Sequence, residues 1–339
     1  MRDHGYHRLR VARVVRETPD ASSFVLEVPA DLEATFAYEA GQFCTFRVEV
    51  DGVELARCYS MSSAPAVDPQ LRVAVKRVPG GAVSNWLNDH VEAGDELDVM
   101  PPAGFFQLDA ADGDVVTFAG GSGITPVLSI VKTALATTDR RVRLLYANRD
   151  RDSIIYGGEL DALAAEHGDR LEVVHRLDVE DGFVDAATVK AFVDASDASF
   201  YICGPGPFMD IVEETLLGLG VDEGRVHIER FTATERVKVV EPDEPESTEV
   251  TIELDGKRAS TTHHPGTTIL QTARSLGMSP PFSCESGSCA TCMAKLLEGS
   301  ARMHVNNALT PDEVDEGWVL TCQAVPTAPV VHVVYGYEE

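Results

Sequence analysis

The stretch CESGSCATC, residues 284–292, places three cysteines close together, and a fourth follows at Cys322. The spacing C-x4-C-x2-C with a distant fourth cysteine is typical of [2Fe–2S] clusters of the plant type. The residues between the first three cysteines are mostly small, so the loop can wrap tightly and bring backbone N–H groups to the cluster sulfurs. The predicted metal ligands are therefore Cys284, Cys289, Cys292 and Cys322. With such a cluster, the protein is predicted to move single electrons.

Two other interpretations of the cysteines fit less well. Zinc sites favour two short cysteine pairs, whereas this segment contains one C-x2-C pair. Disulfides are disfavoured because the N-terminus, MRDHGYHRLR, lacks the apolar core of a secretory signal, and the total of 7 cysteines is odd.

Composition narrows the class of protein further. A chain of 339 residues predicts two or three domains, and 44% hydrophobic residues are enough for packed cores. No apolar run approaches the roughly 18 residues of a membrane span. We therefore expect a cytoplasmic protein without a membrane partner. The formal net charge of -27 also argues against nucleic acid as a partner.

The sequence changes character along the chain, which predicts three modules of unlike type. Residues 1–109 alternate apolar and polar positions in short runs broken by Gly, Pro and Asp, as in an antiparallel β-barrel. Residues 110–232 alternate apolar strand-like runs with helical segments, which predicts a parallel α/β sheet. Residues 233–247 contain EPDEPE and resemble an extended linker. The last module, 248–339, begins with a probable hairpin at Asp255-Gly256.

The first module contains two patterns that suit a flavin nucleotide. Arg57 and Tyr59, in the run RCYS, share one face of a predicted strand and offer a cation for phosphate and a ring for the flavin. The glycine-rich turn GGAVS, residues 80–84, precedes a helical segment and predicts a phosphate site at the helix N-terminus. Either pattern alone is common in ordinary packing, but the pair ahead of a nucleotide-type module is more specific.

The second module contains two glycine-rich turns, each directly after a predicted strand. The turn GGSGITP, residues 120–126, leads into a helix, so glycine and the helix N-terminus favour a pyrophosphate there. The turn CGPGP, residues 203–207, ends a later strand. Open parallel sheets bind ligands at the carboxyl ends of their strands, so the two turns together predict a nucleotide site.

These motifs give the chain a family resemblance along essentially its whole length. Residues 1–232 resemble the ferredoxin–NADP reductase superfamily, and the C-terminal part resembles a plant-type ferredoxin with a β-grasp-like α+β fold. The order of flavin, nicotinamide and ferredoxin domains is similar to that of the reductase components of bacterial multicomponent oxygenases. The reductases of 3-ketosteroid 9α-hydroxylase and of phenylacetyl-CoA epoxidase are examples.

The resemblance implies three cofactors, namely FAD, a [2Fe–2S] cluster and NADH, with NADPH as the alternative to NADH. It implies that the flavin is bound by Arg57, Tyr59, Ser60, Val75, Lys76, Gly81 and Ser84. It implies that the nicotinamide nucleotide is bound by Gly121, Gly123, Thr125, Pro126, Arg149, Gly204 and Pro205. The residues that it places at the reacting rings are Tyr59, Thr125, Cys203 and Phe231, with Glu229 as a further cofactor-binding residue.

The choice between NADH and NADPH depends on the segment NRDRDS, residues 148–153. Arg149, Arg151 and Ser153 are suited to a 2′-phosphate, whereas Asp150 and Asp152 would repel one. The family resemblance favours NADH. One departure from the family pattern is visible in the cluster loop. The family usually has Gly between the second and third cysteines, whereas this chain has Ala290, and alanine there requires a compatible φ.

The predicted function is electron transfer from NAD(P)H through FAD and the cluster to a terminal oxygenase. A nicotinamide gives up two electrons as a hydride, whereas the cluster accepts one at a time, and a flavin can do both. The expected acceptor is a Rieske-type oxygenase of steroid-ring type; the alternatives are a diiron monooxygenase or epoxidase, and a redox-sensing binding module. Residues 248–339 contain 11 acids against 5 Lys and Arg, which predicts a partner with a basic docking patch.

Overall fold

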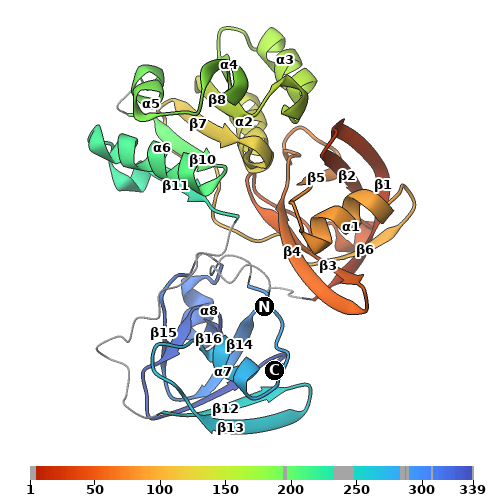
Figure 1. Cartoon of the computed structure of the whole chain (residues 1–339), viewed down its shortest axis with the longest axis vertical. Helices are drawn as coiled ribbons and strands as arrows, with labels where there is room; N and C mark the ends of the chain where they lie inside the picture. Colours follow the sequence, from red (N-terminus) through yellow and green to blue (C-terminus); the bar gives the residue numbers. More distant parts are fainter. Residues whose placement is uncertain are drawn as a thin grey trace. The chain divides into compact units, whose positions relative to one another are not determined.

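The computed structural model describes residues 5–193, 197–231, 248–282, 287, 290–306 and 308–337 (Figure 1). The chain divides into two compact units, Met1–Phe231 and Thr232–Glu339. The predicted linker, residues 233–247, lies outside the described residues. In the part of the chain that is described, no helix has the length and apolar character needed to cross a membrane.

The first unit begins with a six-stranded antiparallel sheet in the order β4-β3-β6-β1-β2-β5, which confirms the predicted antiparallel sheet. Alternation along the strands buries one face, whose core includes Leu9, Phe24, Phe46, Val73 and Val99. A short helix, α1, packs against this core through Val83 and Leu87. The elements are β1 His7–Thr18, β2 Ala21–Glu27, β3 Phe43–Val50, β4 Val53–Ser60, β5 Leu71–Lys76, α1 Ala82–His90 and β6 Glu96–Val99.

A five-stranded parallel sheet follows, in the order β11-β10-β7-β8-β9, as predicted. Its central strands β7, β8 and β10 are buried on both faces, which explains their nearly continuous apolar runs. Along β7, Val115 and Ala119 face helices α2 and α3, whereas Val116 and Phe118 face helices α5 and α6. The elements are β7 Val115–Gly120, α2 Ile124–Thr137, β8 Val142–Asn148, α3 Gly157–Glu166, β9 Leu171–Leu177, α4 Asp178–Asp181, α5 Ala186–Phe192, β10 Ser199–Cys203, α6 Gly206–Gly218 and β11 Val226–Glu229.

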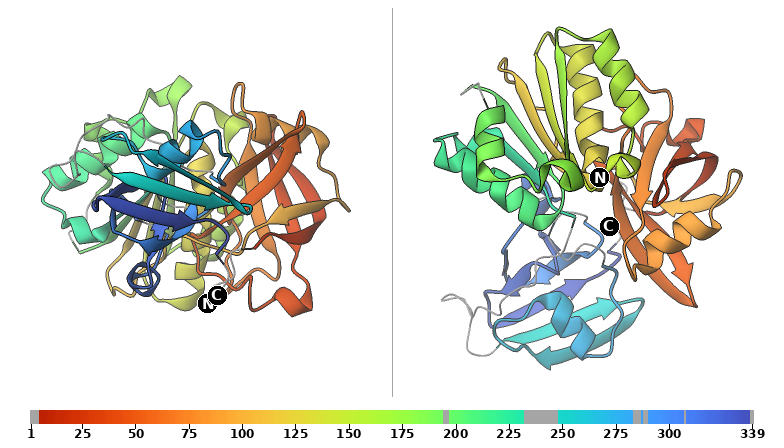
Figure 2. Two further views of the ribbon diagram at one scale, coloured as in Figure 1. Left: turned by 90° about the horizontal axis from the view of Figure 1, so that it is seen from below. Right: turned by 45° about the horizontal axis from the view of Figure 1, so that its top comes forward.

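The two sheets of the first unit share one hydrophobic core. Ala21, Ala40 and Ala74 from the antiparallel part belong to the same buried cluster as Ile124 and Ile130 of helix α2. The right-hand view of Figure 2 shows α2 and its neighbour α3 on the side of the parallel sheet that faces the antiparallel strands. The small alanines allow this close approach, so helix α2 is wedged between the two sheets.

The second unit contains a five-stranded mixed sheet in the order β13-β12-β18-β14-β16 and a pair, β15-β17. The predicted hairpin is confirmed, because Asp255 and Gly256 link β12 to β13 with positive φ angles of 50° and 73°. Helix α7 starts after Thr268, whose side chain caps it. The elements are β12 Glu249–Leu254, β13 Lys257–Thr262, α7 Ile269–Ser275, β14 Met293–Glu298, β15 Ala301–Met303, α8 Pro311–Asp315, β16 Trp318–Leu320, β17 Ala324–Pro326 and β18 Val330–Val334.

Candidate nucleotide and cluster sites

The predicted flavin residues lie on β4, on β5 and at the start of α1. Arg57 is exposed, and its nearest hydrogen bond, of 2.7 Å, is to the neighbouring carbonyl of Ala56, so the guanidinium stands at the surface where a phosphate would reach it. Tyr59 is partly buried and packs edge-on against Phe46, with 5.7 Å between ring centroids. Burial raises the pKa of Tyr59, so its phenol stays neutral beside a bound ring.

The glycine turn before α1 has the geometry of a phosphate cradle. Gly81 is the N-cap residue of α1, and no side chain caps this helix, so its first N–H groups await another acceptor. A Cβ at Gly81 would lie 2.7 Å from Ser84 Oγ, so a larger residue would close the turn. The Ser84 hydroxyl accepts a hydrogen bond of 3.1 Å from the backbone N–H of Val78, which stabilises the turn. These residues fit a nucleotide phosphate.

The two residues predicted on β5 take different places. The side chain of Val75 is buried in the core of the antiparallel sheet, and its carbonyl accepts a hydrogen bond from Asn88, at 3.0 Å. Any contact between Val75 and a flavin therefore involves the backbone, because the side chain is not available. Lys76, in contrast, lines a cavity that extends into the parallel sheet.

That cavity, of about 530 Å³, lies at the carboxyl ends of β7, β8 and β10. Its walls are formed by Lys76, Gly120, Gly121, Ala147, Asn148, Arg149, Asp178, Phe183, Val184, Pro205, Pro207, Phe208 and Ile211. Of the predicted nucleotide residues, the lining thus includes Lys76, Gly121, Arg149 and Pro205. Its volume and its position at the strand ends suit a dinucleotide.

The two glycine-rich turns interlock so closely that no side chain fits between them. A Cβ at Gly123 would lie 2.1 Å from the carbonyl oxygen of Cys203, and a Cβ at Gly204 would lie 2.8 Å from Phe208. Gly121 has a φ of 53°, which glycine adopts at little cost. The glycines therefore bring the two strand ends together and leave backbone groups at the cavity wall.

Thr125 and Pro126, also predicted at this site, are buried in the first turn of α2. The hydroxyl of Thr125 donates to the carbonyl of Ser122, at 3.0 Å, and so stabilises the glycine turn. Neither residue is among the lining of the cavity. In the structure they shape the turn, and a direct contact with the nucleotide stays a prediction.

The segment predicted to choose between NADH and NADPH is largely occupied by its own hydrogen bonds. Asp150 and Ser153 form a reciprocal capping box, in which Asp150 accepts the N–H of Ser153 at 2.9 Å. Arg149 pairs with Asp150 at 2.8 Å, and Arg151 pairs with Glu180 at 3.3 Å. Ser153 is also buried, so its hydroxyl is not presented to a 2′-phosphate.

Several residues that line the cavity were not predicted from the sequence, among them Asn148, Asp178 and Phe183. Asn148 is 4% exposed, and both polar atoms of its side chain lack a hydrogen-bond partner among the described residues. Asp178, at the end of β9, forms no ion pair within the described ranges, and burial raises the pKa of its carboxyl. Phe183 is 81% exposed at the rim. Asp178 directly follows β9 and Phe183 follows α4, both outside any recognised motif, whereas Asn148 ends β8 in the segment NRDRDS, of which only residues 149–153 were considered for a 2′-phosphate.

A carboxyl, a hydroxyl and a thiol meet where the two sheets join. Ser60, at the end of β4, donates a hydrogen bond of 2.8 Å to Oε2 of Glu229, at the end of β11. Glu229 pairs in register with Cys203 of β10. Burial raises the pKa of Glu229 to about 8, although the hydrogen bond from Ser60 lowers it. The pKa of the buried Cys203 thiol is raised by burial and by Glu229, so the thiol stays protonated and is no nucleophile.

Phe231, which the resemblance places at the reacting rings, has a side chain that is 45% exposed. Its neighbour Arg230 is anchored to Asp210 at 2.8 Å and to Glu213 at 2.7 Å, both on α6. These ion pairs anchor the backbone next to Phe231, and a contact between its ring and a flavin stays a prediction.

Two of the four predicted cluster ligands, Cys284 and Cys289, lie outside the described residues. The other two, Cys292 and Cys322, are buried in the second unit. The carbonyl of Cys292 accepts hydrogen bonds from the backbone N–H of Thr321, at 3.2 Å, and from its hydroxyl, at 2.8 Å. Thr321 directly precedes Cys322, so it ties the two ligand-bearing segments together.

Behind these ligands lies a second hydroxyl, that of Tyr335, which donates to Thr321 Oγ1 at 2.8 Å. Gly287, in the cysteine loop, has a φ of 80°, and a Cβ there would lie 2.6 Å from the carbonyl oxygen of Val305. Ala290 adopts a φ of 55°, the left-handed region that favours glycine. The tight loop and the soft thiolate ligands fit an iron–sulfur cluster.

Comparisons with known proteins agree with this geometry. The model of the oxidoreductase FAD-binding domain matches residues 8–108, that of the oxidoreductase NAD-binding domain matches 118–214, and that of the 2Fe-2S iron-sulfur cluster binding domain matches 252–327. The fold and sites thus define an oxidoreductase that joins FAD, NAD and an iron–sulfur cluster in one chain.

Known proteins match nearly the whole length of this chain. The ferredoxin reductase component of 3-ketosteroid-9-alpha-monooxygenase from Rhodococcus rhodochrous is 40% identical over 94% of this chain and 93% of its own. A component of 1,2-phenylacetyl-CoA epoxidase from Escherichia coli K12 is 35% identical over 96% and 97%. Among solved structures, phthalate dioxygenase reductase matches with a TM-score of 0.60 and 28% identity over 98% of both chains. The chain belongs to this family of flavin- and iron–sulfur-containing oxygenase reductases.

Proposed function

We propose that this protein is the reductase component of a steroid-ring oxygenase, which it supplies with electrons from NADH. When bound, FAD accepts a hydride from NADH and releases electrons one at a time to the cluster, which is the chemistry that a two-electron donor and a one-electron carrier require. The observation that carries the proposal is the hydrogen bond between Ser60 of β4 and Glu229 of β11. It joins the strand predicted to bind the flavin to the parallel sheet, whose strand ends carry the closely packed glycine turns.

The residues of the chain have separate tasks in this function. The Gly81 turn and the Gly121 turn bind phosphates through backbone N–H groups, and the cavity, which reaches Lys76 at the end of β5, holds the nicotinamide nucleotide. Glu229 holds a proton up to about pH 8, and Ser60 donates to its carboxyl oxygen. A buried acid with a pKa near the working pH is suited to supplying the proton that reduction of a flavin takes up.

Asp178 supports NADH over NADPH as the donor. Its carboxyl lines the cavity at the end of β9, where no cation pairs with it among the described residues, whereas the nearby Arg149 is paired with Asp150. A carboxylate accepts hydrogen bonds from the ribose hydroxyls of NADH but repels the additional phosphate of NADPH.

The test compares kcat/KM for NADH and for NADPH, with a one-electron dye as acceptor. Asp178→Asn should shift the ratio toward NADPH by about tenfold, which corresponds to ~1.4 kcal/mol. Asp152→Asn is the matched control, because Asp152 is exposed on the neighbouring turn and does not line the cavity. An unchanged ratio in Asp178→Asn, or an equal shift in Asp152→Asn, would refute this part of the proposal.

The steroid-ring partner is supported by the relatives, because the 3-ketosteroid-9-alpha-monooxygenase components have higher identity, 39–40%, than the epoxidase component with 35%. We infer a terminal oxygenase of the Rieske type and place the protein in the cytoplasm, where NADH is supplied. Helix α8 exposes Asp312 and Asp315, which agrees with a basic docking patch on the partner.

The partner is tested by coupling the reductase to purified oxygenases of the two kinds. With NADH, a 3-ketosteroid oxygenase should turn over faster than a phenylacetyl-CoA epoxidase, and its rate should fall as salt is added. If the epoxidase is the better acceptor, the alternative function holds. If rates do not depend on salt, charge does not guide docking.

A further inference from the structure

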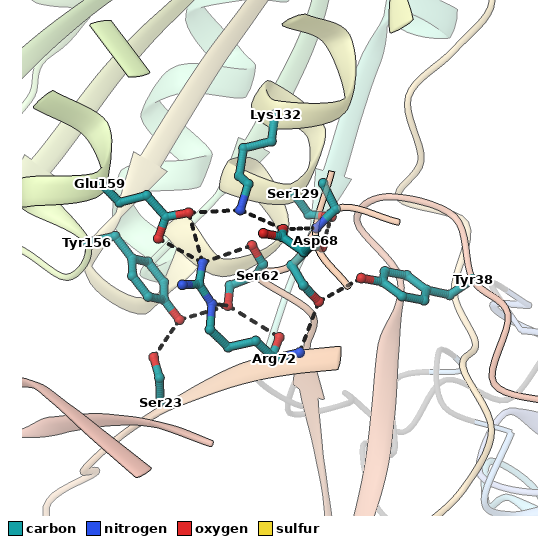
Figure 3. Close-up of polar contacts among 11 residues, drawn as sticks. Ser23, Tyr38, Ser62, Asp68, Arg72, Ser129, Lys132, Tyr156 and Glu159 are labelled. Atoms are coloured by element: carbon teal, nitrogen blue, oxygen red, sulfur yellow. Dashed lines mark hydrogen bonds and ion pairs between the residues drawn. The ribbon is translucent and has the colours of Figure 1, made fainter. Parts of the chain in front are cut away.

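A network of charged and hydroxyl side chains joins the antiparallel part of the first unit to helices α2 and α3, which pack on the parallel sheet (Figure 3). We call Asp68, Arg72, Lys132, Tyr156 and Glu159 the interdomain latch. Asp68 and Arg72 come from the antiparallel part of the unit, and the other three come from helix α2 and the start of helix α3. None of these residues lines the nucleotide cavity or was predicted to bind a cofactor.

The charges in the latch alternate in sign. Lys132 Nζ lies 2.6 Å from Asp68 and 2.8 Å from Glu159, and Arg72 lies 2.8 Å from the same Glu159 carboxylate. The Lys132 side chain is only 5% exposed, so its pairing is poorly screened by solvent. A buried cation between two carboxylates fixes the spacing of the elements that carry them, since removal of one partner leaves an unpaired charge.

Tyr156 adds a backbone feature to the latch. It adopts φ 63° and ψ 23°, a left-handed conformation that bulky residues rarely adopt, directly before Gly157. Its hydroxyl lies 2.7 Å from both Ser23 and Ser62 of the antiparallel part, and Arg72 lies over its ring at 4.5 Å from the centroid. Strain of this kind persists only where the surroundings hold it in place.

Two rigid elements run from the latch to the nucleotide cavity. Along strand β5, Arg72, Ala74 and Lys76 share one face, so Arg72 is in the latch, Ala74 is in the shared core and Lys76 lines the cavity. Four residues of strand span about 13 Å. Helix α2 begins at Ile124, directly after the glycine turn, and reaches Lys132 after about 12 Å.

We propose that the interdomain latch positions the two nucleotide sites for hydride transfer. Hydride transfer needs the reacting atoms to be about 3–3.5 Å apart, and a misplacement of about 1 Å can cost about 10²-fold in rate. The latch sets the distance between strand β5 and helix α2. Strand β5 carries Lys76 of the cavity wall, and helix α2 follows the Gly121 turn, so this distance also sets the positions of Lys76 and of the turn. Given the proposed transfer from NADH to FAD, the latch residues are positioning residues for that step, because none of them lines the nucleotide cavity.

The test uses the full-length holoenzyme with the variants Tyr156→Phe and Glu159→Gln. Anaerobic stopped-flow mixing with increasing NADH separates the apparent Kd from the limiting rate of flavin reduction, and 4-deuterated NADH shows whether hydride transfer limits that rate. We expect the limiting rate to fall by about tenfold or more, with a full deuterium isotope effect and with the apparent Kd changed by less than about twofold.

Glu172→Gln is the matched control, because Glu172 also binds two arginines, Arg143 at 2.7 Å and Arg141 at 3.4 Å, but entirely within the parallel sheet. It should lower the Tm and leave the limiting rate unchanged. Tyr156→Phe removes one hydroxyl and keeps the ring. If Glu159→Gln fails to bind FAD, the limiting rate of Tyr156→Phe alone tests the proposal. The proposal is overturned if a latch variant that binds FAD lowers the Tm and keeps the wild-type limiting rate.

Discussion

In the first unit, the proposed site of hydride transfer lies where two sheets meet, and both a shared apolar cluster and a charged latch hold the two parts together. In the second unit, the two predicted cluster ligands that are described, Cys292 and Cys322, lie in one small core, and a chain of hydroxyl groups from Tyr335 through Thr321 reaches the carbonyl of Cys292. The first unit thus uses many residues to fix the positions of its two sheets relative to each other, whereas the second unit uses few residues to fix the positions of its two described cysteines. This difference follows from what each unit transfers.

A hydride carries a nucleus, so its donor and acceptor must be in contact and correctly oriented. A single electron does not need such contact between reacting atoms, and a cluster mainly needs correct ligands, hydrogen bonds and shielding. The comparison therefore predicts that changes in the first unit alter the rate of hydride transfer, whereas changes in the second alter cluster stability or potential.

The most severe expected effect is in the second unit. Cys322→Ser should abolish the cluster absorbance and the electron transfer that depends on it, since serine replaces a soft thiolate ligand. Flavin reduction by NADH should stay at the wild-type rate. Visible absorbance and stopped-flow flavin bleaching measure the two effects, and slower flavin reduction would show that the units do not act separately.

The next largest effect concerns Glu229 in the first unit. Glu229→Gln keeps the shape of the side chain but replaces the acidic carboxyl with an amide that cannot supply a proton. The limiting rate of flavin reduction should therefore fall by about 10²-fold. In the wild type, the rate should decline as pH rises through about 8, where the carboxyl loses its proton. The variant should lack this inflection, and a retained inflection near pH 8 would assign it to another group.

Glu229 also predicts how stability depends on pH. Its pKa is about 8 in the folded unit against the ordinary value of 4.5, so the folded state binds the proton more tightly than the unfolded state. The free energy of unfolding should therefore decrease between pH 4.5 and 8, and this part of the decrease should be absent in Glu229→Gln. Urea unfolding of the two proteins across this range measures the difference.

A smaller effect is expected from the hydroxyl chain behind the cluster. Tyr335→Phe removes the donor to Thr321 and leaves the ring in place, so the cluster should be lost about tenfold faster under a chelator. The EPR signal of the reduced cluster should shift as well, because Thr321 holds the carbonyl of Cys292. Tyr337→Phe is a suitable control, since Tyr337 packs against Trp318 by its ring. Equal behaviour of both variants would refute the role of the hydroxyl chain.

The smallest expected effect is at Ala290. Its φ of 55° costs an alanine about 1 kcal/mol that a glycine would avoid, so Ala290→Gly should stabilise the cluster loop by roughly this amount. The urea midpoint for cluster bleaching should rise. A lower midpoint would mean that alanine suits this position through its packing.

The sequence predicted those parts of the sites that local geometry dictates. The glycine turns at Gly81, Gly121 and Gly204 are recognisable because a side chain would collide with a neighbour or because the turn needs positive φ, and Asp255-Gly256 is recognisable for the second reason. Asp150 and Ser153 form a capping box, although the sequence suggests Ser153 as a partner for a 2′-phosphate and Asp150 as a residue that would repel one.

Features made by distant parts of the chain could not be predicted. Tyr156 meets Ser23 across 133 positions, and Ser60 meets Glu229 across 169 positions, so no local pattern announces either pair. Glu229 was expected near the flavin only through the family resemblance. Asp178 follows a strand without any motif, and its position at the cavity emerges only when the strands are arranged side by side.

The most direct test of the electron path is anaerobic stopped-flow spectroscopy of the full-length protein with NADH. The proposed path predicts that flavin absorbance bleaches first and that cluster absorbance decreases afterwards, with NADH reacting faster than NADPH. A flavin that bleaches while the cluster stays oxidised would contradict this path and would leave the protein as a flavin reductase.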